Sequence, residues 1–390
     1  MGKLSGLTYT LALTLLCYGL VVFSFGPCLT AIAETYHIQL GRTGLLFSLY
    51  SAGLIPTVLL TGFLSEAVGK RRIIMGAVLA LAVASGLFAG APALGARPEF
   101  GIALAVMVLM GIGAGGIESI GNALIADENQ PSPAFAMNFT HAFFAVGAVA
   151  GPFAAGLLLR QGLPWQIVFY GGAGLLGVLL MAMVAQPKPT ERRGENPLHA
   201  LGLFRSSLLW LLLLVLALYV GAEVGFSAWV SPLMEKVLGA DRGTAALAVS
   251  IFWAFMIVGR LSVSVLSVRY QPAPLLLALG IGSALASYGV ARSPSVALCL
   301  AMSGANGLFM SGVFGLVATD AARYFPDRSG AVFGILTAGV GIGALLMPAA
   351  MGLIASAADL RMAMLVPVVL MGTVAAVYVL PWGGEDRSGV

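Results

Sequence analysis

The sequence predicts an all-α membrane protein, with twelve transmembrane helices in two six-helix pseudo-repeats. Of its 390 residues, 59% are hydrophobic and only 9% are charged, whereas about a quarter of the residues in an ordinary soluble domain are charged. Mean hydropathy is +0.98. Long apolar runs follow one another along the chain with short polar breaks, and about 20 apolar residues suffice for a helix to cross a bilayer. This composition excludes a soluble enzyme.

Each apolar run is long enough to span a membrane, and the runs are read between polar breaks. The first is too long for the apolar region of a signal peptide, so we interpret it as a transmembrane helix. We expect the helices at residues 7–33, 43–66, 73–94, 101–126, 136–159, 165–185, 207–234, 244–267, 273–291, 296–321, 329–356 and 361–381.

One long polar stretch divides these helices six and six. It reads QPKPTERRGENPLHALGLFR and contains prolines and charges, which is typical of a linker. We therefore predict an N-terminal six-helix bundle at 1–186, a cytoplasmic linker at 187–205 and a C-terminal six-helix bundle at 206–390.

The fifth helix of each half carries the same spacing of glycine and proline. The first copy reads GAVAGPFAAG from residue 147, and the second reads GALLMPAAMG from residue 343. A duplicated helical unit that holds its substrate near the midplane is the architecture of many secondary transporters. Glycine and proline also serve simple helix packing in membranes. The residues that we assign to this packing motif are Gly147, Gly151, Pro152, Gly343 and Pro348.

The basic residues predict the orientation. If the N-terminus lies in the cytoplasm, most Lys and Arg residues between the helices, Arg269 among them, fall on the cytoplasmic side and a minority, Arg42 among them, on the other. This bias favours a multi-pass protein of the cell (inner) membrane with both termini inside. The basic residues form no stripe, so we expect no nucleic-acid partner. Three cysteines in apolar segments imply no disulfide framework.

The sequence GFLSEAVGKRR at residues 62–72 ends the second predicted helix. It resembles the signature G-x-x-x-D-R-x-G-R-R of the major facilitator superfamily. Glu66 replaces the usual aspartate and Ala67 the usual arginine, so the resemblance implies that the gating ion pair is weakened or made differently. The residues that we assign to this gating motif are Gly62, Glu66, Gly69, Lys70, Arg71 and Arg72.

Glu118 is the clearest candidate for chemistry. An ionisable side chain inside a membrane costs several kcal/mol and normally faces a partner or a water-filled cavity. Glu118 lies about eight residues before the end of its helix, which at 1.5 Å per residue is roughly 12 Å deep. Asn122 is one turn further on the same face, and Gly111 and Gly115 on that face are expected to leave room beside it. A polar solute would meet both side chains.

Other polar and aromatic residues accompany Glu118. Glu223 is a second buried carboxyl flanked by aromatic residues, and Asn138 and His141 share a helix face. Carboxylates and amides suit paired hydroxyls, and aromatic faces suit the C–H surface of a sugar. The residues that we assign to substrate binding are Glu118, Asn122, Asn138, His141, Tyr219, Glu223, Trp253 and Asn306.

Several of these residues also have a structural interpretation. Asn306 and His141 can bond a neighbouring helix, and Trp253 can face lipid. Arg260, also within a helix, is either a structural charge or a clamp for an organic anion.

At these residues the chain resembles the fucose/galactose/glucose proton symporter (L-fucose permease) family. The matches are Glu118 with Asn122, Asn138 followed by His141, Tyr219 followed by Glu223, and Gly259-Arg260, with His141 and Glu223 standing where the permease has glutamine. The permease uses an aspartate on its first helix for proton coupling, but that helix here has no acid before Glu34. The resemblance therefore implies that proton coupling rests on Glu118 or Glu223.

We expect a secondary active transporter, not an enzyme, that moves a sugar or similar polar solute by proton symport with alternating access. Its partners would be the small-molecule substrate, the coupling proton and the lipid bilayer, and we expect a monomer without metal or cofactor. Two alternatives remain, a drug or metabolite efflux proton antiporter and an organic-anion carrier.

Overall fold

The computed structural model describes residues 4–93, 99–129, 133–187, 205–325 and 329–379. Within these residues the regular structure is helical throughout. Twelve helices are long and apolar enough to cross a membrane. The predicted fold class and the twelve spans are confirmed. Most of the predicted linker lies outside the described residues, and the division into domains at 186 and 206 stays a proposal.

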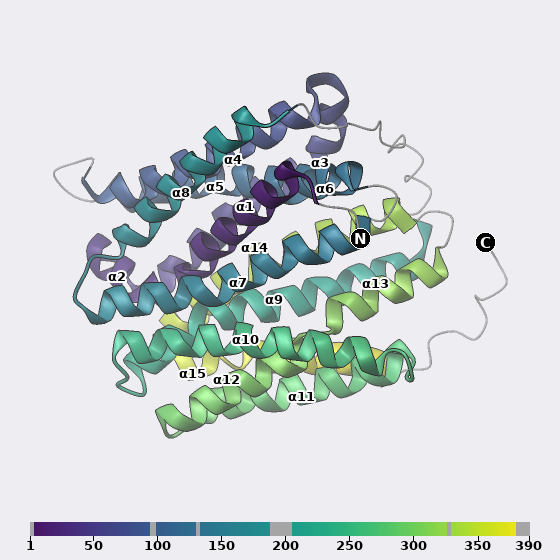
Figure 1. The fold of residues 1–390 in the computed structure, drawn as a ribbon. Helices are drawn as coiled ribbons and strands as arrows, with labels where there is room; N and C mark the ends of the chain where they lie inside the picture. The colour runs from purple at the N-terminus through teal and green to yellow at the C-terminus, as the bar shows by residue number, and fades with distance from the viewer. Residues whose placement is uncertain (1–3, 94–98, 130–132, 188–204, 326–328, 380–390) are drawn as a thin grey trace.

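The first six spans are built from helices that run alternately up and down (Figure 1). The first and second spans each combine two elements, and the fourth is interrupted by a single π turn, η3. Their elements are α1 (Gly6–Phe23), α2 (Phe25–Tyr36), η1 (Leu40–Thr43), α3 (Gly44–Val68), α4 (Lys70–Gly90), α5 (Phe100–Gly116), η3 (Ile117–Gly121), α6 (Asn122–Glu128), α7 (Pro133–Arg160) and α8 (Gln166–Ala185).

Among the last six spans, the tenth and the twelfth are interrupted. The tenth span is broken between two helices, at the position that corresponds to the π turn of the fourth. Their elements are α9 (Ser207–Lys236), α10 (Arg242–Leu266), α11 (Pro272–Arg292), α12 (Val296–Met310), α13 (Val313–Tyr324), α14 (Ser329–Ala357), α15 (Leu360–Ala363) and α16 (Val366–Val379). A short 3-10 turn, η2 (Ala91–Ala93), follows α4.

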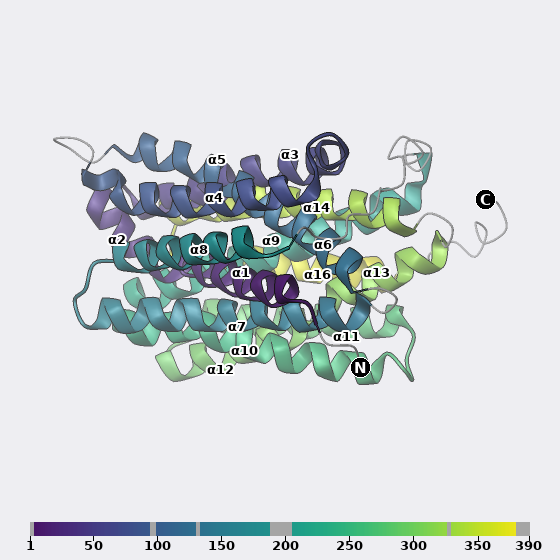
Figure 2. The same ribbon diagram turned by 45° about the horizontal axis from the view of Figure 1, so that its top comes forward.

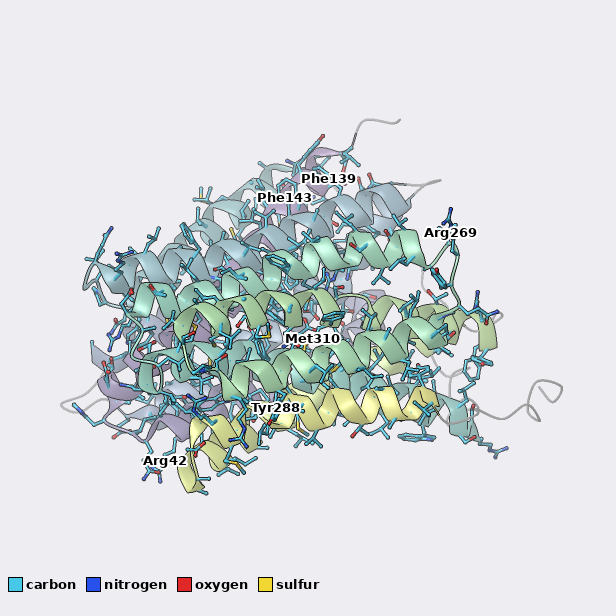
Figure 3. All side chains as sticks on the ribbon, turned by 90° about the horizontal axis from the view of Figure 1, so that it is seen from below. Arg42, Phe139, Phe143, Arg269, Tyr288 and Met310 are labelled. Atoms are coloured by element: carbon cyan, nitrogen blue, oxygen red, sulfur yellow. The ribbon has the colours of Figure 1, made fainter. Side chains whose placement is uncertain are left out.

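All helices run roughly along one axis, so the molecule has two ends (Figures 1 and 2). We call the end where α3 gives way to α4 the Lys70 end, and the end where α2 finishes the Glu34 end. Arg269 and Arg42, which the sequence places on different sides of the membrane, lie at opposite ends of the bundle (Figure 3).

The repeated glycine–proline motif brings corresponding helices together in each half. In the first half, Gly147 of α7 lies against the backbone of α1 at Leu16, where a Cβ atom would clash with the carbonyl oxygen. In the second half, Gly343 of α14 lies in the same way against the backbone of α9 at Ala217. The motif therefore packs the fifth span of each half on the first span of that half, as small residues do in membranes.

The last glycine of each motif packs across the seam between the halves. Gly352 of α14 meets Gly41 of η1, and Gly156 of α7 meets Ala246 and, less closely, Gly243 near the start of α10. Two contacts of small residues thus close the seam, both at the Glu34 end. Hydrogen bonds extend the closure, since Ser48 donates to the Leu345 carbonyl (2.5 Å) and Ser250 to the Val149 carbonyl (3.1 Å).

An ion cluster also crosses the seam at the Glu34 end. Glu34 of α2 pairs with Lys236 (3.5 Å) and with Arg242, and the Arg242 Nε lies 3.6 Å from Glu235. Glu34 and Lys236 are about half exposed, and exposed pairs contribute about 1 kcal/mol or less. Glycine packing is therefore the main closure and the ion pairs are secondary.

We predict that Gly41→Leu disfavours the state closed at the Glu34 end. Overpacking a tight contact costs about 1–3 kcal/mol, and here the added side chain meets the Gly352 backbone of the other half. Spin labels at the exposed positions Gln39 and Val237 should report a longer distance in electron–electron double resonance.

Gly174→Leu is the matched control, because a Cβ atom there meets nothing within 4 Å. An unchanged distance distribution in Gly41→Leu would contradict the role assigned to glycine packing at the seam.

Candidate functional site

Glu118 lies on the π turn of the fourth span and is tied to two other spans. The Tyr18 hydroxyl donates to Glu118 Oε1 at 2.5 Å, and the Tyr18 and Tyr50 hydroxyls lie 2.8 Å apart. Tyr18 comes from α1 and Tyr50 from α3. A π turn inside an α-helix often marks a functional position, because it re-aims the side chains on it. The Glu118 side chain is partly buried. The hydrogen-bonded chain of Tyr18 and Tyr50 offsets the free-energy cost of burying this carboxyl.

The glycines beside Glu118 do not leave open room, contrary to our expectation. Gly111 lies against the backbone of α3 at Tyr50, and Gly115 lies against the same helix at Leu54. Their small size lets α3 approach closely. This approach is what brings the Tyr50 hydroxyl within reach of Tyr18.

His141 and Asn122 meet between the fifth and fourth spans. The His141 Nε2 lies 3.2 Å from the Asn122 Oδ1, and the His141 side chain is exposed while Asn122 is partly buried. The amide group of Asn122 and the second ring nitrogen of His141 keep hydrogen-bonding capacity for a ligand. The Asn138 side chain lies outside the described part of the chain.

The second half contributes Glu223, Tyr219 and Arg260. Glu223 and Tyr219 of α9 are buried, with 8% and 1% of their surfaces exposed. Arg260 of α10 is exposed and acts electrostatically on Glu223, on Tyr219 and on His141 of the first half. Arg260 therefore faces the seam.

Aromatic rings close the site toward the Glu34 end. Phe23, at the end of α1, lies with its ring centroid 4.1 Å from that of Trp253 on α10, across the seam. Phe144 flanks Phe23 at 5.6 Å and Tyr18 at 5.4 Å. The Trp253 Nε1 donates to Ser227 Oγ at 3.2 Å. Trp253 is thus a wall of the site and does not face lipid.

Asn306 lies away from these residues. It is fully buried on α12, and the hydroxyls of Ser283 and Ser287 on α11 donate to its Oδ1 at 2.8 and 3.2 Å. Our assignment of Asn306 to substrate binding is therefore corrected. It has the structural role of joining two helices of the second half.

The predicted gating motif is built around a turn at the Lys70 end. Gly69 has φ +91°, a conformation that favours glycine. Lys70 pairs with Asp127 of α6 at 2.6 Å. Arg71 donates to carbonyl groups at the end of α8, among them that of Met183 at 3.1 Å, which satisfies groups that a helix end leaves unpaired. The Glu66 side chain and the surroundings of Gly62 lie outside what the structure describes, so the pairing of Glu66 stays a prediction.

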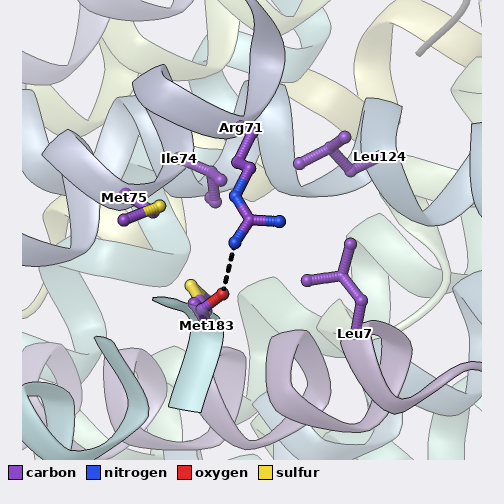
Figure 4. A pocket seen from close by; sticks show the side chains of 6 residues that line it. All are labelled: Leu7, Arg71, Ile74, Met75, Leu124 and Met183. Carbon is purple, nitrogen blue, oxygen red and sulfur yellow. Dashed lines mark hydrogen bonds between the residues drawn. The ribbon is translucent and has the colours of Figure 1, made fainter. Parts of the chain in front are cut away.

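A small cavity lies beside Arg71 (Figure 4), lined by Leu7, Arg71, Ile74, Met75, Leu124 and Met183. Its volume is about 10 Å³, enough for about one water molecule. It is too small and too apolar for a solute, so the candidate site remains the group around Glu118 and Arg260.

Sequence reasoning missed two residues of this site and undervalued a third. Tyr18 and Tyr50 are common aromatic residues in apolar runs, and nothing in the sequence distinguishes them from packing residues. Arg260 is visible in the sequence as a charge within a predicted span. Whether its side chain faces the seam depends on how the two halves pack together, which the sequence does not show. Within the described residues, no group of three or more potential ligands is placed to hold a metal ion.

The chain is similar to several proteins of known sequence. A protein TsgA homolog of Erwinia tasmaniensis is 25% identical over 331 residues, which cover 80% of this chain and 79% of the relative. A protein TsgA homolog of Yersinia enterocolitica is 26% identical over 246 residues, which cover 62% of this chain and 60% of that relative.

Solved structures share the fold. The nucleoside transporter NupG aligns with a TM-score of 0.78 at 13% identity, over 96% of this chain and 98% of its own. A D-xylose-proton symporter aligns with 0.77 at 15% identity, over 96% of each chain. A variant of the E. coli fucose:proton symporter FucP aligns with 0.64 at 16% identity, over 95% of this chain and 97% of its own.

A family model covers nearly the whole chain. The model described as Major Facilitator Superfamily matches residues 11–319 and 230–388, which agrees with the resemblance of the gating motif and with the twelve spans. The chain belongs to the major facilitator superfamily, and is a multi-pass membrane transporter.

Proposed function

We propose that this transporter moves a sugar or a similar polyhydroxylated solute together with a proton. The observation that carries the proposal is Glu118 on its π turn, bonded to Tyr18, which is bonded to Tyr50. Carboxyl, amide and imidazole groups around it can bind neighbouring hydroxyls. The xylose and fucose proton symporters with the same fold support this substrate class.

Glu118 is our candidate for the proton carrier. A hydroxyl donor at 2.5 Å suits the ionised carboxyl, because hydrogen bonds to a charged oxygen are short and strong. A carboxyl that takes up a proton changes from acceptor to donor, so it can then donate to a substrate oxygen. Proton and substrate would thereby occupy the site together. The first span offers no acid nearer than Glu34, which pairs across the seam instead.

The closure at the Glu34 end supports alternating access. The contacts across the seam described above lie at that end, while α6 and α13 at the Lys70 end pack chiefly on helices of their own half. His141 and Arg260 remain exposed. We infer that this conformation presents the site toward the Lys70 end, and that the halves rock to expose it at the other.

The structure supports the two alternatives, efflux antiport and organic-anion transport, to different degrees. Gly147 and Gly151 of the packing motif both lie against the α1 backbone, so they serve helix packing and give the efflux alternative no specific support. The organic-anion alternative gains from the position of Arg260. Because a polyhydroxylated solute can also be an anion, it combines with the proposed function and does not compete with it.

We further propose that the Lys70 end is cytoplasmic and that the protein resides in the cell (inner) membrane. The Lys70 end carries the basic group Lys70, Arg71 and Arg72 together with Arg269, which the positive-inside rule assigns to the cytoplasm.

Glu118→Gln should abolish uphill substrate accumulation while leaving counterflow exchange intact. Glutamine keeps the shape and hydrogen bonding of the side chain but cannot carry a proton. The measurement is pH-driven uptake of hexoses in proteoliposomes, compared with exchange at equal pH. Glu99→Gln, an exposed acid before the same span, is the matched control and should behave as wild type.

The idea fails if Glu118→Gln still accumulates substrate against a gradient. It also fails if wild-type vesicles never move protons when hexoses are added.

Cysteine labelling tests the orientation. A membrane-impermeant maleimide should label Arg42→Cys in intact cells and Arg269→Cys only after permeabilisation, because both side chains are exposed at opposite ends. The native Cys17, Cys28 and Cys299 are buried, so the unmodified protein supplies the background. The reverse pattern would show that the Lys70 end faces outward.

A further inference from the structure

We propose that the substrate is a sugar acid, whose carboxylate binds Arg260 while its hydroxyls bind across the seam at Asn122 and His141. The inference rests on the proposed function, because it names the kind of polyhydroxylated solute that the same site would take.

Arg260 differs from other arginines of this protein in its partners. Arg242 pairs with Glu34 and Glu235, and Arg361 donates to the carbonyls of Ala291 and Ser293, both at 2.9 Å. Among the described residues, no carboxylate forms an ion pair with Arg260, and its Nη2 donates to the Met256 Sδ at 3.5 Å. A thioether is a weak, uncharged acceptor. The guanidinium therefore offers its fork of donors to a ligand.

Tyr219 lies between Glu223 and Arg260. Its buried hydroxyl interacts with both of these side chains. An anionic group bound at Arg260 would therefore meet the Tyr219 hydroxyl as a further hydrogen-bond donor.

Glu223 sets the charge balance at this place. It is the carboxyl that acts on both Tyr219 and Arg260, but it forms no ion pair with the guanidinium among the described residues. A charged Glu223 opposes a bound anion, whereas a protonated Glu223 leaves the positive charge of Arg260 free for it. The group consisting of Arg260, Tyr219 and Glu223 thus favours a ligand of one negative charge.

The net charge of the site favours a carboxylate over a phosphate ester as the anionic group of the ligand. A phosphate monoester carries about 1.5 to 2 negative charges at neutral pH, and Arg260 is the cation of the site with Glu223 beside it. A carboxylate carries one charge, and its two oxygens match the guanidinium fork.

Residues of the first half indicate which other groups the ligand carries besides its carboxylate. Asn122 and His141 lie 3.2 Å apart and are close enough to share one solute, and His141 also lies within the electrostatic reach of Arg260. Phe23 and Trp253 form an apolar wall beside them, which suits the C–H face of a sugar ring. Hydroxyls on one side and a carboxylate on the other describe a sugar acid.

The test compares three ligands of one ring geometry by isothermal titration calorimetry on the purified full-length protein. The ligands are galacturonate, galactose and galactose 6-phosphate. Wild type should bind galacturonate about 10- to 100-fold more tightly than galactose, as a charge-assisted hydrogen-bonded pair provides. The phosphate ester should bind less tightly than galacturonate.

Arg260→Ala should remove the preference for galacturonate while galactose binding persists, which also shows that the variant is folded. Arg260→Lys should keep part of the preference, because it retains the charge but loses the fork. Glu223→Gln should keep or increase the preference. Arg269→Ala, an exposed arginine beyond the end of the same helix, is the matched control and should leave all three affinities unchanged.

Equal affinity for galacturonate and galactose in wild type would overturn the inference, and so would a preference that survives Arg260→Ala. Tighter binding of galactose 6-phosphate would overturn the assignment to a carboxylate. In each of these cases proton-coupled hexose uptake through Glu118 would stand. Binding of none of the three ligands would overturn both the inference and the proposed function.

Discussion

Close approach of helix backbones through glycine is the constraint on which this structure depends. In a bilayer, lipid is as apolar as a leucine side chain, so burial of apolar surface does not drive helices together, and packing contacts do. Gly147 and Gly343 set the first span of each half against the fifth, and the contacts of Gly352 with Gly41 and of Gly156 with Ala246 join the halves. The same sequence motif thus builds each half and closes the seam between them.

A nearly symmetric scaffold carries an asymmetric site. The first half contributes a carboxyl in a chain of two tyrosine hydroxyls, together with an amide and an imidazole. The second half contributes a buried carboxyl, a buried tyrosine and a guanidinium. The residues of the packing motif are therefore not among the polar residues of the candidate site. Those polar residues can differ between the halves without disturbing the fold. This separation explains why similar folds can serve solutes of different kinds.

The sequence predicts the fold well because lipid imposes a strong length and polarity pattern on each span. It also identifies Glu118 and Glu223, since a charge inside an apolar run is costly and visible. It does not predict Tyr18 and Tyr50, whose hydroxyls matter only through contacts between spans. Asn306 was misassigned because a buried amide looks the same in a sequence whether it meets a solute or, as here, two serines of a neighbouring helix.

The interruptions of the fourth and tenth spans have a mechanical consequence. The π turn at Ile117–Gly121 and the break between α12 and α13 stand at corresponding places in the two halves, and each lacks part of the regular i to i−4 ladder that stiffens a helix. The short segments α6 and α13 beyond them are therefore the places where each half can bend with the least disturbance of the longer helices. In the mechanism that we propose, this bending would widen or narrow the entrance at the Lys70 end around solutes of different size.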